Sequence, residues 1–295
     1  MRMLWILYLG ILIMLGACDQ FGSPGAGNHK KLSPEQIKER IHLQKRYADV
    51  KDRLSELNQI IDKATKNLAD LKKEHHGKFY GININVGTME PLGPAEASVA
   101  IVGFIDFQCD ECALFAFDVL PKIQKNYIDT GNIRYYSRDF VQPRHDQAKY
   151  AAVAAFCANE QGMYWPMHEA LFVYHNQLNQ HSYPELSRQI GLDPEKLTDC
   201  LVNSDSVQKV EEDHHYGESV DVISPPTFFL GILEGDQLTD VIMIIGARPY
   251  AEFAAMIDVL LTMSATHNLI EGARTEKAAL VLDASRLQKL VSQYQ

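Results

Sequence analysis

Two cysteines, Cys109 and Cys112, stand three positions apart in the stretch FIDFQCDEC at 104–112. A thiolate is the nucleophile in disulfide exchange, and this spacing lets the second thiol attack a mixed disulfide formed by the first. At a helix N-terminus the first thiol gains a lower pKa, because the free N–H groups favour negative charge there. A zinc site would need two further ligands, and the only compact candidate is His214–His215. The stretch predicts a redox pair, with copper binding by the same thiols as an alternative.

The surrounding residues predict an alternation of strands and helices. An apolar run at 98–105 is typical of a buried strand and leads directly into the cysteines. The later predicted elements are a helix at 113–127, a strand at 132–140, a helical block at 147–216, short strands at 227–230 and 241–245, and a helix at 251–263. This order predicts an α/β fold with the CxxC between the first strand and its helix. This order resembles the thioredoxin arrangement with a helical insertion.

Several further motifs follow one another in the order found in a known family. They are FIDFQCDEC at 104–112; His145, Ala148, Ala151, Ala152, Cys157, Ala158, Glu160-Gln161-Gly162, Trp165 and His168; Cys200-Leu201; Pro226-Thr227-Phe228-Phe229; and Gly246-Ala247. Together they make roughly 98–263 resemble the DsbA-like thioredoxin superfamily, in particular its single-CxxC periplasmic oxidoreductases. The resemblance implies thiol–disulfide exchange, with Cys109 attacking and Cys112 resolving. We predict no cofactor and no metal.

The resemblance also implies roles for residues near the cysteines, with two departures from the family pattern. Pro226 matches the cis-proline that faces the CxxC and presents backbone to a bound peptide. Pro225 stands where Thr or Val is usual and has no N–H, so we do not expect tight sequence-specific gripping. Gly103 stands where the family commonly has a buried Glu. Asp106 could substitute for that acid, or it could cap the next helix.

The dipeptide between the cysteines is a third departure, because strong oxidants of the family often have a histidine there. Asp110 and Glu111 are acids, which favour a helix start but repel a developing thiolate. We therefore expect them to raise the pKa of the reactive thiol. A less stabilised thiolate predicts a milder couple than that of the family's strongest oxidants.

The N-terminus predicts export and lipid attachment. Arg2 precedes the apolar run 4–15, which is short for a membrane span and suits a signal peptide. The tetrapeptide LGAC resembles the bacterial lipobox, which implies cleavage before Cys18 and diacylation of its thiol. Asp19 follows, which in enterobacterial lipoproteins implies retention at the inner membrane. A plain signal peptide or an anchor with a chance cysteine remains the alternative.

Removing Cys18 leaves four of the five cysteines, an even number that suggests two pairs in an exported protein. Cys109 and Cys112 pair through proximity. Cys157 and Cys200, both matched by the resemblance, would then form a structural bridge, or remain two separate buried thiols.

A heptad stripe precedes the predicted catalytic domain. Its residues are Leu43, Tyr47, Val50, Leu54, Leu57, Ile61, Ala64, Leu68 and Leu71. Spacings that alternate between four and three favour a coiled coil, and hence a homo-oligomer, over a helix packed on its own domain. The region 29–78 holds 13 Lys and Arg against 8 Asp and Glu, although the net charge of the chain is -10. A chain this acidic does not suit nucleic-acid binding.

These patterns together predict the domain organisation and the function. We expect a signal peptide at 1–17, a flexible linker at 18–32, a stalk at 33–76, a DsbA-like domain at 96–263 with its insertion at about 145–216, and a polar helical tail at 264–295. The expected protein is an envelope oxidoreductase, lipid-anchored on the periplasmic side of a bacterial membrane. It would form or rearrange disulfides in unfolded or misoxidised exported proteins, coupled to a membrane redox partner. The alternative is an oligomeric chaperone or a copper-binding envelope protein.

Overall fold

The computed structural model describes residues 31–75 and 78–294. The predicted signal peptide, Cys18 and most of the predicted linker lie outside these residues. The chain divides into two compact units, 52–281 and a smaller one made of 1–51 with 282–295. The larger unit holds both cysteine pairs.

A mixed β-sheet forms the centre of the larger unit, with the order β1-β6-β5-β3-β4 and β2 also paired with β6. Its strands are β1 (Phe79–Tyr80), β2 (Ile84–Asn85), β3 (Val99–Ile105), β4 (Ile133–Asp139), β5 (Thr227–Glu234) and β6 (Gln237–Ile245). The β3–β4 pair is parallel, whereas β5 runs antiparallel to both β3 and β6. Every residue of β3 is buried, as expected for a central strand covered on both faces.

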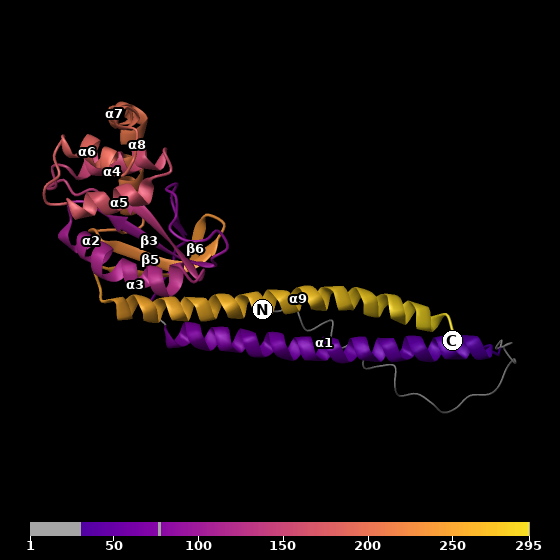
Figure 1. Ribbon diagram of the computed structural model, residues 1–295. Helices are drawn as coiled ribbons and strands as arrows, with labels where there is room; N and C mark the ends of the chain where they lie inside the picture. Colours follow the sequence, from indigo (N-terminus) through magenta and orange to yellow (C-terminus); the bar gives the residue numbers. More distant parts are fainter. Residues whose placement is uncertain (1–30, 76–77, 295) are drawn as a thin grey trace. The chain divides into compact units, whose positions relative to one another are not determined.

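Helices cover the two faces and one end of this sheet (Figure 1). A continuous helical stretch begins within the CxxC: α2 (Asp110–Leu114), a π-helical turn η1 (Phe115–Val119), α3 (Leu120–Ile123) and a second π-helical turn η2 (Gln124–Ile128). The insertion consists of α4 (Ala148–Asn159), α5 (Tyr164–Val173), α6 (Ser182–Gln189), α7 (Pro194–Leu201) and α8 (Ser204–Ser219). The last helix is α9 (Tyr250–Ser292). The expected α/β thioredoxin fold with a helical insertion and a long preceding helix is confirmed.

Strand alternation divides the core into two layers. On one face, Ile101 and Phe228 pack with Phe115 of η1 and Phe253 of α9. On the other, Phe104 stacks with Tyr216 of α8, their ring centroids 6.2 Å apart. Because side chains at successive strand positions point to opposite faces, each strand supplies both layers.

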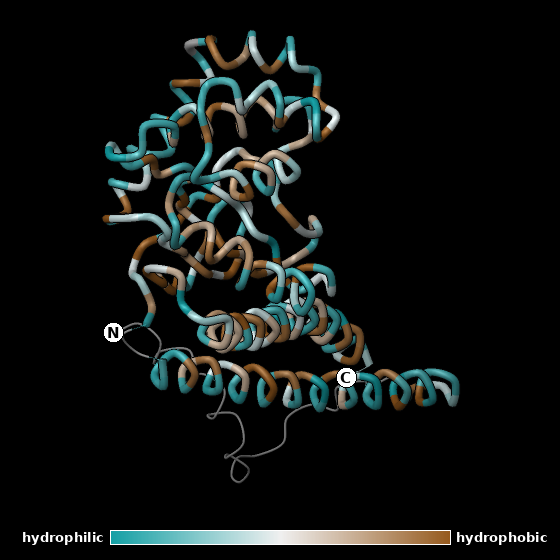
Figure 2. The backbone as a smooth tube through the Cα atoms, turned by 60° about the vertical axis from the view of Figure 1, so that its left-hand side comes forward, coloured by the Kyte–Doolittle hydropathy of each residue, from teal (hydrophilic) through white to brown (hydrophobic). Residues whose placement is uncertain are grey.

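The predicted stalk is the helix α1 (Pro34–Glu74), along which hydrophilic and hydrophobic segments alternate (Figure 2). It begins with a capping box, in which Gln36 N–H donates to Ser33 Oγ and Ser33 N–H donates to Gln36 Oε1. Within the larger unit, Leu68 and Leu71 pack against the core layer that contains α9, and Arg53 pairs with Glu276 of α9. The apolar stripe therefore has a partner within the same chain.

The final helix differs from the expected division at residue 263, because α9 continues unbroken to Ser292. Its second half carries a heptad stripe that the sequence analysis missed: Ile270, Ala273, Lys277, Leu280, Ala284 and Leu287. In the smaller unit, Arg46 pairs with Asp283 and Leu43 and Leu287 are buried. The helix is long and apolar enough to cross a membrane by length and composition alone, but burial of Phe253 and its neighbours accounts for its apolar first half.

Candidate active site

The CxxC lies where β3 gives way to α2. Cys109 is the N-cap residue of α2, and its carbonyl accepts from the N–H of Ala113 at 3.0 Å. Asp110 and Glu111 occupy the first turn, where acids favour helix formation. Both thiols are buried, but Cys109 keeps 6% of its surface exposed whereas Cys112 has none. An incoming disulfide would therefore reach Cys109 first.

The two thiols differ strongly in acidity. A hydrogen bond from Cys112, joined by the backbone N–H groups of Cys112 and Glu111, lowers the pKa of Cys109 to about 7, although burial and Asp106 act against it. Burial is the main cause that raises the pKa of Cys112 well above its ordinary value. Near neutral pH Cys109 is thus partly ionised while Cys112 stays protonated, which is the arrangement that a nucleophile and a resolving thiol need.

The net pKa of Cys109 is lowered, whereas the acidic dipeptide was expected to raise it. Asp110 points to solvent, with its side chain 85% exposed, and lies 3.3 Å from Nε2 of His175. Neither carboxylate is among the main causes that shift the pKa of Cys109, and the backbone N–H of Glu111 lowers it. The hydrogen bond from Cys112 and the N–H groups at the helix start account for the downward net shift, while solvent screens the exposed carboxylates.

The Pro225–Pro226 loop faces Cys109. The peptide bond between the two prolines is cis, and the Cys109 thiol lies 3.7 Å from the carbonyl oxygen of Pro225. The carbonyl of Pro226 is already used, since it accepts from the N–H of Gly246 at 2.8 Å. This loop therefore offers a bound peptide a carbonyl acceptor at Pro225 but no N–H donor from either proline.

Asp106 lies beside the cysteines, buried and fully engaged. Its Oδ1 accepts from the N–H of Gln108, while Oδ2 accepts from the N–H of Gln142 and contacts Nδ1 of His145, each at 2.8 Å. The Asp106 side chain does not cap α2, because it forms no hydrogen bond with the first residues of that helix. Its negative charge raises the pKa of both cysteines, so it is electrostatically part of the site.

A residue that the sequence analysis missed fills the space next to Gly103. A Cβ on Gly103 would stand 2.6 Å from the hydroxyl oxygen of Tyr135 on β4. A side chain at position 103 would therefore have to displace the ring of Tyr135. The sequence did carry a sign of this residue, because Tyr135, Ser137 and Asp139 place polar groups at alternate positions of a strand that is otherwise buried.

The second cysteine pair lies within the insertion. A disulfide joins Cys157 of α4 to Cys200 of α7, with their Cα atoms 5.8 Å apart. Cys157 is buried in the core layer shared by α4 and α5. The bridge thus ties the small helix α7 to the helix that packs against the catalytic motif.

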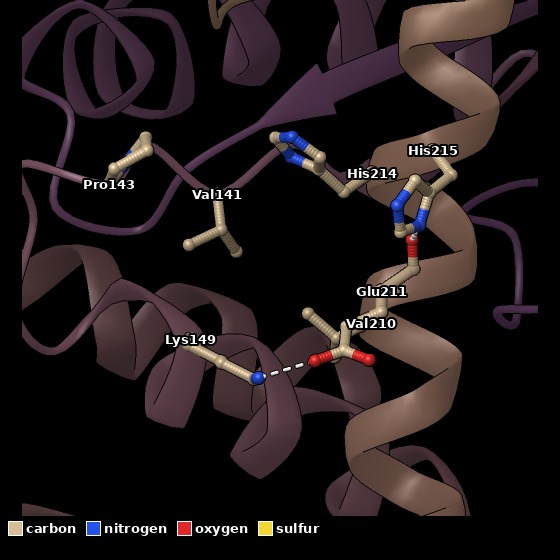
Figure 3. Close-up of a pocket in the computed structure, with 7 residues that line it drawn as sticks. All are labelled: Val141, Pro143, Lys149, Val210, Glu211, His214 and His215. Carbon is tan, nitrogen blue, oxygen red and sulfur yellow. Dashed lines mark hydrogen bonds and ion pairs between the residues drawn. The ribbon is translucent and has the colours of Figure 1, made fainter.

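The histidine pair considered as a zinc site lies on α8. Figure 3 shows His214 and His215 at a small pocket of about 180 Å³, together with Val141 and the ion pair of Lys149 with Glu211. His214 stacks on Phe140, and His215 Nδ1 contacts the carbonyl of Glu211 at 2.7 Å. Over residues 31–75 and 78–294, no group of three or more His, Cys, Asp or Glu side chains converges as a metal site would require.

Comparison with known proteins identifies the relatives of this chain. Residues 85–242 match the family described as Thioredoxin. The chain is 28% identical over 150 residues to disulfide bond formation protein D of Bacillus subtilis, covering 47% of this chain and 66% of that protein. It is also 28% identical over 139 residues to Na(+)/H(+) antiporter NhaA 3 of Salinispora tropica, which covers 47% of this chain but only 21% of the antiporter.

A solved structure supports the same fold. Alpha-DsbA1 of Wolbachia pipientis matches with a TM-score of 0.55 and 21% identity, over 61% of this chain and 94% of that one. The chain spans about a fifth of the antiporter and about two thirds of the Bacillus protein. Because the family match extends over more than half of its residues, this chain belongs to the thioredoxin family, and its fold is that of the DsbA-like members.

Proposed function

We propose that this protein is a thiol–disulfide oxidoreductase that forms or rearranges disulfides in exported proteins. The observation that carries the proposal is the pair of unlike thiols, in which Cys109 is ionisable near neutral pH and Cys112 is buried and protonated. Cys109 attacks or is attacked, Cys112 resolves, and the loop at Pro226 orients the substrate chain. The Bacillus relative, a disulfide bond formation protein by name, supports the same chemistry.

The substrate class follows from the shape of the site. The Pro225 carbonyl beside Cys109 offers one backbone acceptor, which any extended chain can meet with an N–H. Recognition through backbone groups suits unfolded or misoxidised proteins of many sequences. The lipobox-like segment supports action at the periplasmic face of a membrane, with Cys18 as the anchor and a membrane redox partner as the electron source or sink.

The pKa of about 7 on Cys109 supports a moderate couple, suited to rearranging disulfides as well as forming them. The stripe of α1 supports self-association less than its spacing suggested, because in the larger unit Leu68 and Leu71 of the stripe pack with the core layer that contains α9.

The test is insulin reduction and oxidative refolding by the full chain in detergent, in a Cys18→Ser background. We expect activity that Cys109→Ala abolishes, and a trapped mixed disulfide with substrate for Cys112→Ala but not for Cys109→Ala. Scrambled ribonuclease then separates isomerase from oxidase activity. If Cys109→Ala retains full chaperone or copper-binding function while the parent shows no disulfide exchange, the binding-protein alternative replaces this proposal.

A further inference from the structure

The two acids between the cysteines are exposed and lie beside the reactive thiol. Asp110 and Glu111 follow Cys109 directly, in the first turn of α2, and both side chains reach solvent. Neither is among the main causes that shift the pKa of Cys109. Charges at the mouth of a site act instead on the charge of the molecule that approaches it. The two carboxylates are therefore placed to act on the substrate.

The Asp110 carboxylate contacts a histidine that has no proton to give it. His175, two residues beyond α5, places its Nε2 3.3 Å from Asp110 Oδ1. Nδ1 of the same ring lies 2.8 Å from the carbonyl oxygen of Phe172, which can only accept, so Nδ1 carries a proton. Nε2 lies 2.8 Å from the amide Nδ2 of Asn176, which donates to it. A neutral His175 thus satisfies both contacts and leaves the charge of Asp110 unpaired.

Glu111 turns toward a different element, the loop between β6 and α9. A Cβ on Gly246 would stand 3.2 Å from Glu111 Oε2. The N–H of Gly246 donates to the carbonyl of Pro226, so the carboxylate lies beside the loop that is joined to the cis-proline. Arg248 is the cation of this loop, and its Nε donates to the carbonyl of Ile245 at 3.1 Å. No Lys or Arg of the described residues forms an ion pair with Glu111.

A disulfide that reacts with Cys109 has to come to the start of α2, where both charges lie. Attack forms a bond from the Cys109 sulfur to one substrate sulfur, breaks the substrate disulfide and releases its other sulfur as a thiolate. A cation next to the substrate sulfurs is attracted by the two carboxylates and offsets the charge of the leaving thiolate. An anion at the same place is repelled. Two unit charges roughly 7 Å apart in water change such a rate by about threefold.

We propose that Asp110 and Glu111 select substrate cysteines that are flanked by lysine or arginine. They are specificity-determining residues, because they act on the approaching chain and on the leaving thiolate. The inference rests on the proposed function and narrows its substrate class. Since the two carboxylates turn toward different elements, we expect cations on either side of the substrate cysteine to be favoured.

The test compares three small aliphatic disulfides that differ in charge. Cystamine carries two ammonium groups, 3,3′-dithiodipropionate carries two carboxylates, and bis(2-hydroxyethyl) disulfide is neutral. The full chain with Cys18→Ser, reduced and in neutral detergent, is mixed with an excess of each disulfide at neutral pH and low salt. Acid quench and mass spectrometry then give the rate at which the reduced protein is lost.

The variants remove one or both charges and keep the shape of the side chains. They are Asp110→Asn, Glu111→Gln and the double variant. The matched control is Asp118→Asn, which removes an exposed carboxylate farther along the same helical stretch, in η1. Each rate is divided by the rate with the neutral disulfide, which corrects for any change in the reactivity of the thiol itself.

We expect each single variant to react about threefold more slowly with cystamine and about threefold faster with dithiodipropionate, so that the ratio of the two rates falls about ninefold. The double variant should show a larger fall, and Asp118→Asn should keep the ratio of the parent. Because the Debye length is about 3 Å at 1 M ionic strength, salt at that concentration should bring the parent close to the double variant.

Three results would overturn the selection by charge. They are an unchanged ratio in the double variant, an equal fall in Asp118→Asn, and a preference for cystamine in the parent that salt does not reduce. The proposed function itself would fail in a different way. In that case the parent would react with none of the three disulfides, or Cys109→Ala would react as fast as the parent.

Discussion

Removing the hydrogen bond that Cys112 donates should make Cys109 a markedly weaker nucleophile at neutral pH. That bond is the largest cause of the lowered Cys109 pKa, ahead of the backbone N–H groups. In Cys112→Ala the donor is lost while burial and Asp106 still raise the pKa. We therefore expect the Cys109 pKa to rise from about 7 toward its ordinary value of 9.0.

The size of the effect on reactivity follows from two opposing factors. At pH 7 the thiolate fraction would fall from about one half to about 1%, a loss of about fiftyfold. Each thiolate would become about eightfold more nucleophilic, because nucleophilicity rises with pKa with a coefficient of about 0.4–0.5. The net expectation is an alkylation rate about sixfold lower at pH 7.

The assay is the pH dependence of thiolate absorbance at 240 nm and of iodoacetamide reaction, in a Cys18→Ser background in which Cys109 is the single free thiol. Cys112→Ser is the matched control, because its hydroxyl can still donate and should hold the pKa near 7. A pKa of about 7 in Cys112→Ala would show that the helix start alone sets the acidity, and our reasoning about the thiol pair would be wrong. A serine variant that behaves like the alanine variant would refute it equally.

Three further predictions concern stability and redox poise. Burial lowers the pKa of His168 to about 3. Between pH 3 and 6.5 the folded chain therefore binds fewer protons at this residue than the unfolded chain does. The free energy of unfolding should fall as the pH drops through that window, by on the order of 1 kcal/mol per pH unit. Urea unfolding at several pH values should show this slope flattened in His168→Phe but unchanged in His267→Phe, whose side chain is exposed. The double variant Cys157→Ala/Cys200→Ala should lose about 4 kcal/mol of unfolding free energy through loop closure over 43 residues, and added reductant should lower the midpoint of the parent but not of the variant. Equilibration with glutathione should give a reduction potential closer to about −270 mV than to about −120 mV. The first value belongs to a CxxC couple whose reactive thiol has a pKa of about 7, and the second to one whose thiol has a pKa of about 3.5.

Much of the fold was predictable because its signals are local. The apolar run at 98–105 became β3, and the alternating residues at 132–140 became β4, each within a residue of the expected bounds. The helix predicted at 251–263 continues to Ser292, and the heptad stripe in its second half was missed because Lys277 interrupts it. A heptad stripe indicates that one face of a helix is covered, but it does not indicate what covers that face. The stripe of α1 therefore could not by itself distinguish self-association from packing within the same chain.

The sequence by itself determined the groups of the site and their order along the chain: two thiols at a helix start, a Pro-Pro loop and a second cysteine pair. Only the tertiary structure decided how acidic the reactive thiol is, because acidity depends on the direction of side chains that local spacing does not set. Asp110 turns to solvent, whereas backbone N–H groups and Cys112 converge on Cys109. In the same way, the absence of a side chain at Gly103 of β3 is explained only by Tyr135. That tyrosine lies 32 positions further along the chain and contacts Gly103 across the sheet.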